Sequence, residues 1–250
     1  MVASGRALCA LLEGRFEQAG GLIEEAYRLG ERAMPWNAAV TRDLQLFALR
    51  RGQGRLDELE ETVRGAVQAY PTYPVWRCVL ADLHAQLGRE DEARAEFERF
   101  AAGDFTGVPF NEEWLLGMTL LADVCAALGD VPRAVRLYEL LVRYCELHAV
   151  GQVEISFGAV ARALGKLAAT AGRFEQATRH FEAAIQLNQQ SGARPWTAHA
   201  RHDYARMLAA RGDRQPAHQQ LAQALATYRK LGMDRWADNT LSRDGSTFPT

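Results

Sequence analysis

Apolar and polar positions follow a pattern along this chain that repeats at intervals of 34 to 43 residues. Six glycines mark the repeat: Gly14, Gly54, Gly88, Gly129, Gly172 and Gly212. An apolar residue stands nine positions after each glycine, and alanine stands five positions after five of the six. A recurring unit of this size indicates a repeat protein.

Each glycine separates two segments with helical periodicity. Residues 152–171 carry apolar side chains at helical spacing, and a second such segment begins at Phe174, just after Gly172. A glycine in the left-handed conformation is a common helix stop. The pattern therefore predicts an all-α fold of six helix pairs, with the bounds 3–13 and 16–32, 36–51 and 56–69, 74–87 and 90–102, 111–128 and 131–148, 152–171 and 174–190, and 196–211 and 214–231.

The recurring alanines and tryptophans are predicted to be structural. A small side chain five residues after the turn lets the two helices of a pair cross closely. Four tryptophans stand near the starts of first helices: Trp36, Trp76, Trp114 and Trp196. They suggest a ladder of indole rings wedged between units, and the alternative is an aromatic row that binds a peptide. Trp236 follows the last unit and is expected in a partial capping helix.

The connections indicate one continuous domain. Residues 103–110 form the longest connection, where we expect a hinge or a binding loop. The repeat register resumes after it, so it is not a domain boundary. We expect a helical repeat domain over residues 1–238 and a polar, disordered tail over residues 239–250.

Composition narrows the class of partner. Apolar residues make up 48% of the chain and charged residues 24%, as in soluble folded proteins. The 29 basic and 31 acidic side chains nearly balance, which argues against nucleic acid as a direct partner. Apolar runs are too short for a membrane helix, and the amino-terminal residues lack the features of a signal peptide. We expect a cytoplasmic protein without a membrane partner, whose four cysteines are reduced core thiols.

Motifs that carry chemistry are missing from the sequence. It contains no GxxxxGK[ST] phosphate loop, no GxSxG elbow and no HExxH zinc pattern. His199 and His202 lie one helical turn apart, but the nearby Asp203 is expected to point to another face. The sequence therefore predicts a non-catalytic protein with no cofactor and no metal.

The repeat resembles the tetratricopeptide repeat over roughly residues 1–231. The fifth unit carries the clearest match, with Leu164 and Gly165 in the first helix, the turn at Gly172, and Ala177 and Phe181 in the second helix. The other units replace the first-helix glycine and run longer than the family's repeat, so the chain resembles a degenerate, long-repeat subtype. This resemblance implies an α-solenoid, a right-handed superhelix of about six hairpins.

A narrower likeness concerns residues 194–212 and 70–76. These segments are similar to the C-terminal repeat region of large bacterial regulators, in which repeats follow a cyclase or DNA-binding module and a STAND-type NTPase. The likeness implies the interaction or sensor part of such a regulator. No catalytic part of one is present in the sequence.

The family register predicts which side chains line the concave groove of the superhelix. They include Asp82, Gln86, Thr119, Asp123, Arg162, Lys166, His199, His202 and Arg206. We expect an inner wall that is acidic in the middle and basic at the C-terminal end, where it could hold a peptide's carboxylate or phosphate. The alternative is a solvated charged face with no ligand.

Two functions fit these expectations. The first is a protein- or peptide-binding scaffold, an interaction or regulatory module that uses the concave groove. The second is a small-molecule sensor domain of a bacterial transcriptional or signalling regulator. An open charged groove favours the scaffold, and a deep apolar pocket with convergent polar groups favours the sensor. The sequence leaves open the identity of the partner and the oligomeric state, a homo-oligomer included.

Overall fold

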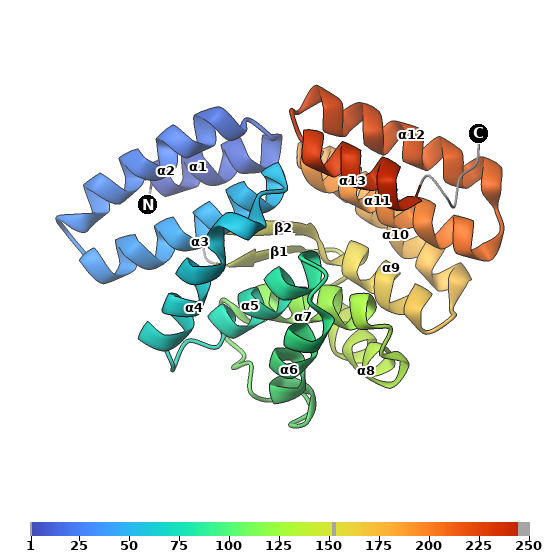
Figure 1. Cartoon of the computed structure of the whole chain (residues 1–250), viewed down its shortest axis with the longest axis horizontal. Helices are drawn as coiled ribbons and strands as arrows, with labels where there is room; N and C mark the ends of the chain where they lie inside the picture. The colour runs from blue at the N-terminus through green and yellow to red at the C-terminus, as the bar shows by residue number, and fades with distance from the viewer. Residues whose placement is uncertain (1, 152–153, 245–250) are drawn as a thin grey trace.

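The computed structural model describes residues 2–151 and 154–244. Within them the chain forms six helical hairpins and a final single helix (Figure 1). The α-helices are α1 (Val2–Glu13), α2 (Phe16–Glu31), α3 (Pro35–Gln53), α4 (Glu60–Ala69), α5 (Val75–Gln86), α6 (Glu90–Ala101), α7 (Trp114–Leu128), α8 (Val131–Leu141), α9 (Val160–Thr170), α10 (Phe174–Gln190), α11 (Arg194–Arg211), α12 (Arg214–Lys230) and α13 (Asp234–Asp244). Two 3₁₀ turns, η1 (Leu56–Leu59) and η2 (Val142–Tyr144), and two strands, β1 (His148–Gly151) and β2 (Ile155–Ala159), complete the described elements.

The all-α repeat fold predicted from the glycine pattern is confirmed. All six marker glycines have a positive φ, between 64° and 94°, and stand in the turn between the two helices of a hairpin. The alanines five positions later are fully buried where the helices cross. In the fifth unit the ring of Phe181 packs against Gly165 so closely that a Cβ atom there would lie 2.8 Å from the ring.

The predicted helix over residues 152–171 is wrong in its first part. The chain instead forms an antiparallel hairpin of β1 and β2, and α9 begins only at Val160. Gly158 has a φ of 71°, and a Cβ atom there would lie 2.6 Å from Trp196, so this glycine allows a left-handed backbone and close packing. A short apolar run fits helical and strand periods alike, which is why spacing alone misassigned it.

The strand hairpin fills the middle of the molecule. Phe157 of β2 is buried, with its ring 6.0 Å from Phe47 of α3 and 5.1 Å from Trp196 of α11. The guanidinium of Arg51 lies 4.8 Å from the same ring. The strands therefore join the amino-terminal and carboxy-terminal hairpins through one aromatic side chain.

The two ends of the repeat array meet. Figure 1 shows an arc in which α1–α3 and α10–α13 face each other above the central hairpins. Gly14 lies against Leu231 and Pro195. On the other side Trp236 Nε1 of α13 donates a hydrogen bond to the carbonyl of Arg51 at 2.7 Å, and Arg235 pairs with Asp57 at 3.1 Å. The expected concave groove is thus bridged between its ends, because α13 reaches across to α3 and η1.

Several local expectations also change. Residues 103–110 are anchored by the buried side chains of Phe105 and Val108 and by the pairing of Asp104 with Arg136, and their role as a hinge or binding loop stays a prediction. The expected disordered tail is helical up to Asp244 of α13, and its remainder, residues 245–250, lies outside the described residues. Cys9 is exposed rather than a core thiol.

The tryptophans do not form a regular ladder. Trp76 is fully buried, whereas the side chain of Trp36 is 56% exposed and Trp114 is only partly buried. Trp196 packs against Phe157 of the strand hairpin, whereas the ladder would place it between two neighbouring helical units. Of the helices that the structure describes, none combines the length and the apolar character that crossing a bilayer requires.

Candidate functional site

A cavity of about 650 Å³ lies on the concave side of the arc, between the inner helices and α13. We call it the central pocket. Seven of the nine side chains predicted as groove residues line it: Gln86, Asp123, Arg162, Lys166, His199, His202 and Arg206. The other two, Asp82 and Thr119, are buried, and Asp82 reaches the pocket through its ion pair with Arg51. The residues are brought together, and their binding role stays a prediction.

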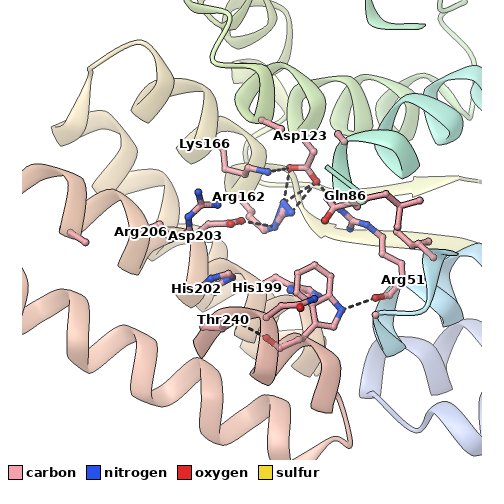
Figure 2. Close-up of a pocket in the computed structure, with 18 of the residues that line it drawn as sticks. Arg51, Gln86, Asp123, Arg162, Lys166, His199, His202, Asp203, Arg206 and Thr240 are labelled. Atoms are coloured by element: carbon pink, nitrogen blue, oxygen red, sulfur yellow. Dashed lines mark hydrogen bonds and ion pairs between the residues drawn. The ribbon is translucent and has the colours of Figure 1, made fainter. Parts of the chain in front are cut away.

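Asp123 of α7 is the centre of a buried ion-pair network (Figure 2). Its carboxylate accepts hydrogen bonds from Nη1 and Nη2 of Arg162 at 2.9 Å each and from Nζ of Lys166 at 2.7 Å. Both cations project from one face of α9, where they are four residues apart. Nη2 of Arg51 donates from the opposite side at 3.1 Å. Burial works to raise the pKa of Asp123, but Arg162, Lys166 and Arg51 outweigh it and hold that pKa below its ordinary value.

Asp82 of α5 occupies a less favourable place in the same network. It faces one cation, Arg51, whose Nε lies 3.1 Å from Oδ2, and it accepts a hydrogen bond from Gln86. Burial raises the pKa of Asp82, and the attraction of Arg51 does not offset it because the charge of Asp123 lies nearby. The network therefore depends mainly on Asp123.

Asp203 belongs to the pocket, so the expectation that it points to another face was wrong. Its Oδ2 lies 3.3 Å from Nε of Arg162. His199, Asp203 and Arg206 stand at positions i, i+4 and i+7 of α11 and therefore share a helical face. We expected acidic and basic side chains in separate zones of the wall. They instead form ion pairs with one another, as Arg162 does with Asp123 and Asp203.

The rim of the pocket is basic. Arg206 is exposed, His202 is half-buried, and the side chain of Lys166 is 19% exposed. Four cationic side chains line the pocket, against two lining carboxylates and the adjoining Asp82. A ligand at the rim would thus meet a slightly positive surface above a neutralised floor.

His199 supports the aromatic wall of the pocket instead of supplying charge. Its ring lies 4.5 Å from Trp236 and 5.3 Å from Trp196, and its Nδ1 is 2.8 Å from the hydroxyl of Tyr228. Burial, together with the positive field of Arg162, lowers the pKa of His199 well below its ordinary value. A neutral imidazole does not attract an anionic ligand, so this predicted member of the basic cluster changes role.

Besides Asp203, sequence reasoning missed two pocket residues. Arg51 was predicted only as the last residue of the helix over residues 36–51, yet it is buried between Asp82 and Asp123. Its partners lie on α5 and α7, and no local pattern signals such contacts. Trp236 was expected in a capping helix, which α13 confirms, but its position over the pocket follows from the closure of the arc.

Comparison with known proteins bears on the repeats. Family models described as tetratricopeptide repeat match residues 75–99, 115–139 and 156–230. The first two segments fall on α5–α6 and α7–α8, and the third runs from β2 to the end of α12. Searches of curated proteins and of solved structures find no match to the chain. The third to sixth helical hairpins of this protein are therefore tetratricopeptide repeats.

Proposed function

We propose that the protein is a non-catalytic binding module that holds a short acidic segment of a partner protein in the central pocket. The observation that carries the proposal is the basic rim formed by Lys166, His202 and Arg206 above a neutralised ion-pair floor. Tetratricopeptide repeats in general mediate contacts between proteins, and an extended or helical segment is the usual form of such ligands.

The shape of the pocket supports a short ligand. A volume of about 650 Å³ holds a few residues, and α13 with Trp236 and Thr240 limits how far a chain could extend. Carboxylates of the ligand would accept charge-assisted hydrogen bonds from Lys166 and Arg206. The aromatic wall around His199 offers apolar area next to those donors.

The finer parts of the proposal follow from the sequence likeness. We place the module in a cytoplasmic bacterial regulatory system, as the interaction part of a larger regulator or as a free-standing subunit. Direct nucleic-acid and membrane partners are not proposed, because the side-chain charges nearly balance. Self-association into a homo-oligomer is compatible with this role.

Selection from a displayed library of random peptides tests the proposal. The wild-type chain should enrich segments rich in aspartate and glutamate, and Arg206→Glu should lose that enrichment because it reverses an exposed rim charge. Arg214→Glu is the matched control, since Arg214 is exposed on α12 and does not line the pocket. Equal enrichment by all three proteins would overturn the proposal. Arg162→Glu is unsuitable, since it would bury a carboxylate beside Asp123.

A small-molecule sensor is the second candidate. The bridging of the arc by α13 favours it, because a cavity of this size is typical of small-ligand pockets. Native mass spectrometry of the protein purified from its own cells distinguishes the two. If the wild-type protein carries one bound metabolite per chain and the Arg206→Glu variant does not, the sensor function is supported and the peptide-binding function is rejected.

A further inference from the structure

A row of exposed and half-buried aromatic side chains follows one edge of the repeat array. Its members stand at or beside the starts of α3, α5 and α7 and in η2, which follows α8. Equivalent positions of stacked repeats lie side by side along one edge of the array. None of these side chains lines the central pocket. We call this surface the aromatic row, and it consists of Trp36, Tyr70, Tyr73, Phe110, Trp114 and Tyr144.

The first group of rings in the row surrounds Trp36. The ring of Tyr70 lies 5.7 Å from that of Trp36 at an angle of 90°, and the ring of Tyr73 lies 6.4 Å away at 69°. An edge-to-face contact leaves the other face of a ring uncovered. The side chain of Trp36 is accordingly 56% exposed although it touches two other aromatic residues.

The second group surrounds Trp114. Its ring lies 5.1 Å from that of Phe110 at 59° and 5.3 Å from that of Tyr144 at 63°. Phe110 is 76% exposed, and Trp114 and Tyr144 are half-buried. Exposed apolar side chains that lie next to one another, rather than singly, are typical of a surface that binds a partner.

Hydrogen bonds join the two groups and fix their geometry. The hydroxyl of Tyr73 donates to Oε1 of Glu113, the residue before Trp114, at 2.8 Å. The backbone N–H of Glu113 donates to Oδ1 of Asn111 at 3.0 Å, and that of Trp114 donates to the carbonyl of Asn111 at 3.1 Å. The aromatic row is therefore already ordered without a ligand, which lowers the entropy cost of binding one.

The surroundings of the row are slightly negative. Glu112 is exposed beside the buried Glu113, and burial together with these two carboxylates raises the pKa of Tyr73. At the other end Glu146 and Arg143 are both exposed and offset each other. A ligand of the row would thus meet aromatic faces next to the carboxylate of Glu112, an arrangement that suits a guanidinium group.

We propose that the aromatic row binds a proline-rich segment of a partner protein that carries arginine and adopts the polyproline II conformation. Proline rings pack on aromatic faces, and a polyproline II segment has little conformational entropy left to lose. Its arginine would stack on an indole ring and pair with Glu112. This ligand differs from the acidic segment proposed for the central pocket in both charge and place, so the two would bind independently.

Calorimetric titration of the whole chain with three synthetic nonapeptides, blocked at both ends, tests this site. The first has the sequence Pro-Pro-Arg-Pro-Pro-Pro-Arg-Pro-Pro, the second has glutamate in place of arginine, and the third has glycine in place of proline. We expect the first to bind at least about ten times more tightly than either of the others, because it combines the cation with the preformed conformation.

Two variants of exposed rings locate the binding site without endangering the fold. Phe110→Ala and Trp36→Ala should each weaken binding of the arginine–proline peptide by about fivefold or more, since each removes an aromatic contact face. Val131→Ala is the matched control, because Val131 is an exposed apolar residue of α8 outside the row. Arg206→Glu, which alters the central pocket, should also bind this peptide as wild type does.

Four results would overturn the proposal. They are equal affinity for all three peptides, no binding at millimolar concentration, wild-type affinity in both ring variants, and a loss of binding in Arg206→Glu alone, which would place the peptide in the central pocket. Sedimentation of the protein with phosphatidylcholine vesicles, abolished in Phe110→Ala and without peptide binding, would instead assign the row to a membrane surface.

Discussion

Asp123 is the residue on which the central pocket depends most. It accepts bonds from cations on α3 and α9, so it links units that are far apart in the sequence. Arg162 is buried, and the same bonds offset the free-energy cost of removing its charge from water. A buried network of this kind makes the pocket floor rigid and leaves ligand recognition to the rim.

Replacing this carboxylate should be costly. Asp123→Asn leaves buried cations without a counter-charge, and we expect a loss of about 3–5 kcal/mol in the free energy of unfolding, measured in urea. Asp104→Asn is the control, because Asp104 pairs with Arg136 at the surface, where solvent screens the pair and its loss should change the free energy of unfolding little. Similar small losses in both variants would contradict the role given to Asp123.

His199 gives the fold a pH dependence. Its pKa is lowered in the folded state, so the unfolded chain binds a proton there at a higher pH than the folded chain does. Stability should therefore fall as pH drops below the ordinary histidine pKa, by up to about 1.4 kcal/mol per pH unit for one proton.

We expect the free energy of unfolding of His199→Gln to depend less on pH than that of the wild type, by the contribution of about one bound proton. The measurement is the free energy of unfolding between pH 7.5 and pH 5, roughly the range over which an ordinary histidine titrates. The replacement of His218, which is exposed on α12, serves as the comparison. An unchanged slope in His199→Gln would mean that this imidazole is not buried as described. His84, His148 and His180, whose pKa values are also lowered, explain the part of the slope that remains.

At the scale of elements, the hairpins are held by close helix crossings. Gly165→Ala should destabilise the fifth hairpin by about 1–3 kcal/mol, because its Cβ atom would lie 2.8 Å from the ring of Phe181. Gly21→Ala makes the same chemical change in α2, where no atom apart from the adjacent residues and the backbone of the helix itself lies within 4 Å of the added carbon. It should stabilise the protein by about 0.5–1 kcal/mol, since alanine favours a helix over glycine. Thermal unfolding of the two variants should shift in opposite directions.

The last element, α13, closes the arc through few contacts. Arg235→Glu places a carboxylate opposite Asp57 and should increase hydrogen exchange in α13 and around η1, with little change in α5–α8. Restoring opposite charges with Asp57→Arg in the same chain should return the exchange to the wild-type rate. Unchanged exchange in Arg235→Glu would show that this pair does not contribute to closure.

Sequence periodicity predicted elements well where the repeat was regular. The bounds of α10 and the turns at all six glycines agree with it, because amphipathic spacing and a left-handed glycine act locally. The strands β1 and β2 were not predictable in this way. Their formation depends on Gly158 and on the pairing of Phe157 with Phe47 and Trp196, which are distant in sequence.

At the scale of the whole molecule, the closure of the arc decides what kind of site the protein has. The repeat register predicted that Asp123, Arg162 and Arg206 face the same side of the molecule, and all three line the central pocket. It could not predict that Trp236 bonds to Arg51 or that α13 covers the pocket, because repeat periodicity carries no information about contacts between the two ends. The result is a pocket with a basic rim, bordered by α13, in place of a continuous groove.

Hydrogen exchange with and without a selected acidic peptide tests the central claim most directly. We predict slower exchange on peptide binding in α11, α13 and the end of α3, which surround the central pocket, and no such change in Arg206→Glu. Protection confined to the outer helices α6, α8 and α12, or equal protection in Arg206→Glu, would contradict the account.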